Sequence, residues 1–338
     1  MSRFMVQTVR FRFLVAALLV IGTAVSGAWA QKGGGGRTGG GTIFFEDCGA
    51  CTYTWSMNSD GSNINPLGFF ACFQYPSRTL HNTHRWFLAV GTIPDSYYPD
   101  GTTQRAEVFA YRDDCTKVQL TNDATLDPAG SWWYGMQWLP GDQKISFKAR
   151  RWSGTTITEG GIYTADLLYD ADGNIIGLAA QPTLALAFSL NASGWPDFGV
   201  HSWDPAGNRV VYNGNAVTGL WVADLAANTR TLILAGNAAY PDWSPDGTKI
   251  LFNRGGICTI KPNGTGLKEV IKPTYLETVY WSGFGHAYFS PTGSHIVCVG
   301  CTSHNGGNND VFRATSSGGS LTNLTKTDSV NEIPIGWR

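Results

Sequence analysis

Four residues whose side chains could bind a ligand or a metal ion lie just before aromatic residues that recur along the chain. They are His201, Tyr240, Asp242 and His286. Histidine nitrogens and carboxylate oxygens that converge on one point can hold a divalent metal. If the fold brings these residues together, they form either a binding site or, with a bound cation, a site for metal-assisted chemistry.

The spacing of the two histidines argues against a shared metal. His201 lies two residues before Trp203, whereas His286 lies three residues before Phe289. On a β-strand, a shift of one residue turns a side chain to the opposite face. The alternative interpretation is that each histidine hydrogen-bonds a neighbouring strand or faces water in a channel.

An aromatic cluster forms a second candidate site. It contains Trp132, Trp133 and Tyr134. Because neighbouring residues of a strand point in opposite directions, Trp132 and Trp133 cannot both face the core. An exposed aromatic ring can stack on a sugar or hold a peptide side chain. The alternative is that these rings pack between neighbouring structural units.

The composition excludes several classes of protein. The 338 residues include 24 Lys and Arg against 25 Asp and Glu, so the chain offers no net basic charge for nucleic acid. A hydrophobic content of 43% is enough for a large core, and the many glycine and aromatic residues favour short strands joined by turns. The sequence has no nucleophile elbow, glycine-rich phosphate loop or H-E-x-x-H motif. We therefore expect an all-β protein without a recognised catalytic motif.

A repeat provides the elements that must position the candidate residues. Four segments start with an aromatic residue, continue through a turn with Pro and Gly, and end in an alternating apolar strand: 138–147, 203–212, 243–252 and 289–298. In each, the first apolar strand residue lies seven positions after the aromatic one. Further strands and a polar turn follow. Each unit is predicted to be a four-stranded antiparallel sheet that must stack on its neighbours to bury both faces.

The number of units predicts the architecture. The recurring aromatic residues, here called the anchors, are Trp138, Trp203, Trp243, Phe289 and Trp337. They are 65, 40, 46 and 48 residues apart, so the unit that starts at the first anchor carries an insertion. Residues 331–337 are predicted to form the opening strand of a unit whose other strands do not follow it in the sequence. Residues 42–58 are predicted to form a unit that lacks its opening strand. At about 50 residues per unit, residues 42–338 predict a six-bladed β-propeller, closed when the C-terminal strand joins the N-terminal blade.

The last three units resemble a known family. Residues 240–252 and 257–265 are closely similar to the WD-like repeat of TolB-type propellers. This resemblance implies a bacterial extracytoplasmic propeller, often a binding module, with a glycine tether where TolB carries an α/β domain. Oligogalacturonate lyases of the same superfamily hold a metal ion in a similar channel, which suggests an enzyme as the alternative.

The N-terminal region predicts export. In residues 1–30, arginines precede an apolar run that ends in Ala28-Trp29-Ala30, the pattern of a cleavable secretory signal. A membrane anchor is the alternative, but polar and small residues interrupt the run. Residues 31–41 form a Gly-rich tether. We expect a periplasmic or secreted protein with no membrane span after signal cleavage.

The cysteines fit an oxidising compartment. All seven follow the signal, so disulfides are expected, with one thiol left over. The C-x-x-C pairs Cys48/Cys51 and Cys298/Cys301 could instead form a four-thiolate zinc site, or the cysteines could be buried small residues.

Two functional hypotheses follow. The first is an exported binding module, acting without a cofactor, that recognises a protein or saccharide of the cell envelope at one propeller face. The alternative is a metal-assisted polysaccharide lyase or hydrolase that works at the channel mouth with a divalent metal.

Overall fold

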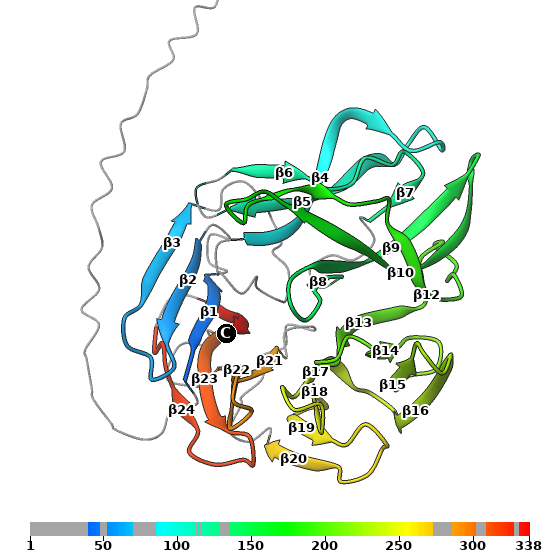
Figure 1. The fold of residues 1–338 in the computed structure, drawn as a ribbon. Helices are drawn as coiled ribbons and strands as arrows, with labels where there is room; N and C mark the ends of the chain where they lie inside the picture. The colour runs from blue at the N-terminus through cyan, green and yellow to red at the C-terminus, as the bar shows by residue number, and fades with distance from the viewer. Residues whose placement is uncertain are drawn as a thin grey trace, which may run out of the picture. The chain divides into compact units, whose positions relative to one another are not determined.

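The described part of the chain consists of antiparallel β-sheets and turns. The computed structural model describes residues 40–47, 53–69, 86–112, 114, 116–128, 135–272, 286–301, 309–327 and 331–338. Their strands form six sheets arranged as a six-bladed β-propeller (Figure 1). The structure thus confirms the all-β class and the number of blades that the repeat predicted.

The N-terminal predictions are not tested by the structure. The predicted signal peptide (1–30) and residues 31–39 of the predicted tether lie outside the described residues. In the part of the chain that is described, no helix is long and apolar enough to cross a membrane. Export therefore stays a prediction.

Blades 4, 5 and 6 each have four strands in chain order, and the first strand of each lies toward the centre of the ring in Figure 1. Blade 4 contains β13 (Phe198–Trp203), β14 (Arg209–Gly214), β15 (Gly219–Asp224) and β16 (Thr229–Ala235). Blade 5 contains β17 (Ala239–Trp243), β18 (Ile250–Asn253), β19 (Ile257–Ile260) and β20 (Lys268–Ile271). Blade 6 contains β21 (Ala287–Phe289), β22 (His295–Cys301), β23 (Asn309–Thr315) and β24 (Thr322–Asn323).

Blade 1 joins the two ends of the propeller, as the sequence predicted. Its strands are β25 (Glu332–Trp337), β1 (Thr42–Asp47), β2 (Tyr53–Asn58) and β3 (Asn65–Phe69). The C-terminal strand β25 pairs antiparallel with β1, and Trp337 lies opposite Ile43. The red and blue strands are adjacent in Figure 1. Because this pairing covers the edges of both strands, it closes the ring.

Blades 2 and 3 depart from the four-strand pattern. Blade 2 shows β4 (Trp86–Tyr97), β5 (Gln104–Arg112) and β6 (Lys117–Gln119), and the residues just before β4 lie outside the described ranges. Blade 3 contains β7 (Leu126–Asp127), β8 (Met136–Trp138), β9 (Lys144–Ser153), β10 (Thr156–Tyr169), β11 (Ile175–Leu178) and β12 (Thr183–Ala187). The predicted insertion lengthens the β9–β10 hairpin, which pairs with β7 on one side and with both β11 and β12 on the other.

In blades 3 to 6, the anchor pairs with the apolar residue seven positions later. In blade 5, Trp243 ends β17 and is the register partner of Ile250 in β18, and the same register occurs in blades 3, 4 and 6. The turn is closed by the amide of Ser244, which donates to the carbonyl of Lys249 at 2.9 Å. Gly247 has a φ of 68°, which glycine adopts without strain. This turn explains the constant spacing of the repeat.

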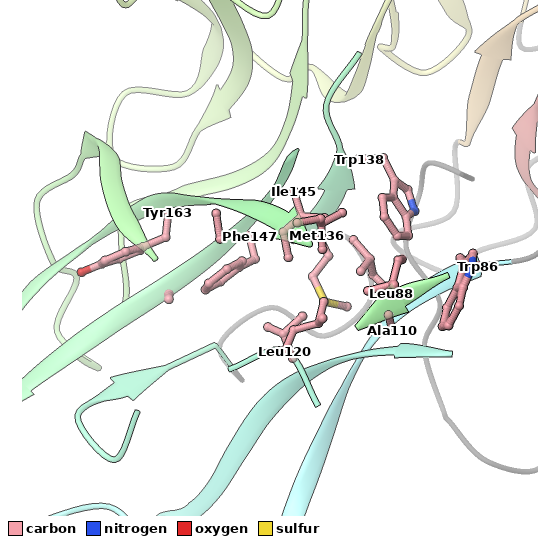
Figure 2. Close-up of a cluster of buried hydrophobic side chains, with 14 of the residues drawn as sticks. Trp86, Leu88, Ala110, Leu120, Met136, Trp138, Ile145, Phe147 and Tyr163 are labelled. Atoms are coloured by element: carbon pink, nitrogen blue, oxygen red, sulfur yellow. The ribbon is translucent and has the colours of Figure 1, made fainter. Parts of the chain in front are cut away.

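Apolar side chains pack between neighbouring blades. Figure 2 shows the cluster in which Leu88 and Ala110 of blade 2 lie with Met136, Ile145 and Phe147 of blade 3. Comparable clusters join blades 3 and 4, 4 and 5, 5 and 6, and 6 and 1. Stacking thus buries faces that a single blade would leave in water.

The pairing of anchor and strand makes a prediction for stability. Ile250 is fully buried, so we expect Ile250→Ala to lower the free energy of unfolding by about 2 to 5 kcal/mol, through lost apolar burial and the cavity left behind. The matched control is Ile176→Ala, at a side chain that is 58% exposed. It should change stability by less than about 0.5 kcal/mol. Denaturant unfolding of both variants measures the difference, and equal effects would contradict the proposed role of the pairing.

Candidate functional site

A pocket of about 460 Å³ lies where the inner strands end. Five blades contribute equivalent positions: the anchor, the residue before it and, in four blades, the proline of the following turn. The lining residues are Gln137, Trp138, Pro140, Ser202, Trp203, Pro205, Asp242, Trp243, Pro245, Tyr288, Phe289, Ser290, Pro291, Gly336, Trp337 and Arg338. We call this site the axial pocket. Because each of these blades contributes the same positions, the shape of the axial pocket follows directly from the propeller fold.

The anchor rings form the pocket wall while most of their surface is covered. Trp203, Trp243 and Trp337 are 5 to 7% exposed. Trp203 Nε1 donates to Ser146 Oγ at 2.8 Å, and Trp243 Nε1 donates to the carbonyl of Ser202 at 3.2 Å. Trp337 Nε1 donates to a backbone carbonyl at 2.8 Å. These indole N–H groups are therefore used in holding neighbouring segments together.

Asp242 brings a carboxylate to the axial pocket. Its Oδ1 accepts a hydrogen bond from Ser202 Oγ at 3.4 Å, and its Oδ2 accepts one from the amide of Phe289 at 3.4 Å. The side chain thus lies between blades 4 and 6 and is half-buried. Of the four residues that the sequence placed at the channel mouth, Asp242 is the one that lines this pocket.

His201 is buried in the seam between blades 3 and 4. Its Nε2 lies 3.1 Å from Ser146 Oγ, and Gln137 Nε2 donates to its backbone carbonyl. The side chain is 0% exposed and does not line the axial pocket. This geometry corresponds to the interpretation of a histidine that hydrogen-bonds a neighbouring strand.

Tyr240 and His286 contact each other across blades 5 and 6. Their ring centroids are 4.6 Å apart, with the planes tilted by 45°. Tyr240 has a φ of 53° at a register shift between β17 and β18. This left-handed conformation is uncommon for a residue other than glycine. His286 is 1% exposed, and neither residue lines the axial pocket.

The described residues do not fit a shared metal centre. Among them, no group of three His, Cys, Asp or Glu side chains is placed to hold a metal ion. Instead, His201 approaches Ser146, and His286 packs on Tyr240. Within the described ranges, the two histidines therefore lie in different seams and do not form one group of ligands.

Two sequence predictions fall mostly outside the described ranges. The aromatic cluster of Trp132, Trp133 and Tyr134 does so completely, as do four of the seven cysteines. Cys258 and Cys298 are buried free thiols, and burial raises the pKa of Cys298 to about 12. These two cysteines thus match the interpretation of buried small residues, whereas disulfides among the others stay a prediction.

Sequence reasoning missed two buried cations in the seam between blades 3 and 4. Lys148 is 6% exposed, and its Nζ donates to the carbonyl of Phe198 and lies 4.6 Å from that ring's centroid. Arg150 Nε donates to Asp127 Oδ2 at 2.8 Å, and its guanidinium lies 3.6 Å from the centroid of Trp195. Burial lowers the pKa of Lys148 to about 8, although a nearby carboxylate partly offsets the shift.

The alternation of apolar and polar residues along β9 is the sequence pattern that could have predicted these buried cations. Ile145 and Phe147 face one side, and Ser146, Lys148 and Arg150 face the other. In an isolated sheet the polar side would face water. In a propeller both faces of a blade are covered, so these polar side chains become buried.

Comparison with solved structures shows the fold. TolB from Acinetobacter baumannii superposes with a TM-score of 0.58 at 13% identity, covering 89% of this chain and 67% of that one. A protein provisionally assigned as TolB from Agrobacterium tumefaciens superposes with a TM-score of 0.53 at 13% identity, covering 87% of this chain and 97% of that one. An oligogalacturonate lyase from Vibrio parahaemolyticus gives 0.44 at 10% identity, covering 82% and 69%, which is too low to bear on function. No protein-family model matches the chain, and no curated protein is significantly similar to it. The resemblance to TolB-type propellers is therefore confirmed for the fold.

Lys148 predicts a pH-dependent stability. Its pKa is lower in the folded chain than the ordinary value of 10.5, so the unfolded chain binds more protons between pH 8 and 10.5. The stability of the natural chain relative to Lys148→Met should therefore rise by about 2 to 3 kcal/mol across this range, and should not change below pH 8. Denaturant unfolding at a series of pH values measures the difference. Lys144→Met, at the partly exposed start of the same strand, is the control, and the same trend there would contradict the assignment.

Proposed function

We propose that this chain is an exported binding module that recognises a protein partner at the axial pocket. The observation that carries the proposal is the pocket itself, in which five blades contribute equivalent residues around one opening. Concave sites with apolar walls and a few polar groups are typical binding sites. The signal pattern in residues 1–30 supports a periplasmic or secreted location.

The exposure of the anchor rings favours a protein over a saccharide. A sugar is commonly bound by stacking on an open aromatic face. Trp203, Trp243 and Trp337 are almost fully buried, and the guanidinium of Arg209 lies 4.7 Å from the ring centroid of Trp243. A narrow polypeptide loop that inserts one side chain needs no open ring face. A saccharide remains the second kind of partner to be tested.

The metal-assisted lyase remains the alternative, and metal content tests it. We expect the purified chain, dialysed without chelator, to contain no stoichiometric metal, because His201 and His286 make contacts with other residues. Elemental analysis by mass spectrometry measures this. Stoichiometric manganese, calcium or zinc that is lost in His286→Ala would instead support the lyase and would contradict a binding module without a cofactor.

A blocked pocket tests the binding proposal directly. Pro245 is exposed at the pocket rim, so Pro245→Trp should obstruct the opening while leaving the inner strands in place. Peptides selected from a displayed random library against the natural chain should bind this variant at least about tenfold more weakly, as expected when a central contact is lost. Surface plasmon resonance with the selected peptides provides the measurement.

The matched control is the same substitution away from the pocket. Pro99 is exposed in the β4–β5 hairpin and does not line the axial pocket. Peptides should bind Pro99→Trp as they bind the natural chain. If Pro99→Trp abolishes binding and Pro245→Trp does not, the binding face lies elsewhere. If only oligosaccharides from a glycan array bind, and Pro245→Trp blocks them, the partner is a saccharide.

A further inference from the structure

We infer that the group inserted into the axial pocket is a cation, the side chain of a lysine or arginine of the partner. This inference rests on the proposed function, because it names the chemistry that the same pocket would recognise. It follows from the hydrogen-bonding groups of the pocket, their charges, and the walls around them.

The first observation is an acceptor that the fold directs to the pocket. Gln137 lies directly before its anchor and lines the axial pocket. Its Nε2 donates to the carbonyl of His201, and this bond fixes which end of the amide faces that carbonyl. The other end of the amide is Oε1, a carbonyl oxygen that can only accept hydrogen bonds. Gln137 therefore adds an acceptor group to the residues that line the pocket.

The second observation is the way in which the donors around the pocket are used. Ser202 Oγ donates to Asp242 Oδ1, and the indole N–H groups of Trp203 and Trp243 donate to Ser146 and to the Ser202 carbonyl. These three donors are thus already used, whereas the carboxylate of Asp242 and the amide oxygen of Gln137 are acceptors that a group rich in N–H donors can satisfy. Ammonium and guanidinium groups carry three and five such donors.

The third observation is charge. Asp242 is the carboxylate among the lining residues, and it lies between aromatic walls. A carboxylate beside aromatic rings favours a cation through charge-assisted hydrogen bonds and through attraction to the rings. Arg338 also lines the pocket and is the basic residue among the lining residues. Its charge opposes that of Asp242, so the two residues should have opposite effects on a charged ligand.

The test uses small probes of matched shape. N-acetyl-lysine amide and N-acetyl-arginine amide are titrated into the chain labelled with ¹⁵N at the tryptophan indoles, and N-acetyl-norleucine amide and N-acetyl-glutamate amide are the controls. We expect the two cationic probes, and not the controls, to shift the indole signals of Trp138, Trp203, Trp243 and Trp337. Substitution of each tryptophan by phenylalanine assigns these signals.

Two variants, each of which removes one charge from the pocket, test whether the pocket favours a cation or an anion. Asp242→Asn should weaken binding of N-acetyl-lysine amide by about fivefold or more, because a charge-assisted hydrogen bond becomes a neutral one. Arg338→Gln should strengthen it by about two- to threefold, since a like charge is removed. Asp172→Asn, in an exposed turn of blade 3, is the matched control and should leave binding unchanged. The indole spectrum without probe shows whether each variant keeps the fold.

The other outcomes overturn the inference in distinguishable ways. Binding of the glutamate probe, with the effects of Asp242→Asn and Arg338→Gln reversed, means that the pocket takes an anion. Equal binding of norleucine means that it takes an apolar group. If no probe shifts the pocket indoles, the pocket does not select cations. In each case the Pro245→Trp experiment separately decides whether the pocket binds a partner at all.

Discussion

The architecture depends on one local contact, the pairing of the anchors of blades 3 to 6 with the apolar residue seven positions later. In blade 5 this contact joins Trp243 to Ile250, and the turn between them fixes the end of the inner strand. Since the same contact recurs in blades 3, 4 and 6, the residue before each anchor reaches the same level of the ring. The axial pocket is the result of this repetition. The pairing of β25 with β1 closes the ring and brings Trp337 to the same level.

Most of the fold could be predicted from the sequence, because a repeat with fixed internal spacing leaves few alternatives. The spacing predicted the anchors, the turns, the number of blades and the closing strand. The shape of blade 3 could not be predicted. The long interval between Trp138 and Trp203 indicates an insertion, but strand length depends on which partners are available. There, β10 pairs with β9 along most of its length and with both β11 and β12 at its other edge.

The candidate site could be predicted only in part, because neighbouring side chains of an inner strand lie in different surroundings, some in the pocket and some between blades. Asp242 lies one residue before its anchor and lines the pocket, whereas His201 and His286 lie two and three residues before theirs and are buried between blades. Each step along a strand moves about 3.3 Å and reverses the face. Local irregularities, such as the register shift at Tyr240, move these positions further. Sequence spacing alone does not contain that information.

The seam between blades 3 and 4 adds a polar strip to the apolar packing found in the other seams. Burying charged groups such as those of Lys148 and Arg150 carries a desolvation cost that apolar residues of similar size do not have. The same strip contains the hydrogen bonds from Gln137 to His201 and from Trp203 to Ser146, and both donors line the axial pocket. Apolar contacts allow neighbouring blades to shift slightly, but a satisfied hydrogen-bond network specifies one arrangement. The polar strip therefore holds Gln137 and Trp203 in place at the wall of the axial pocket.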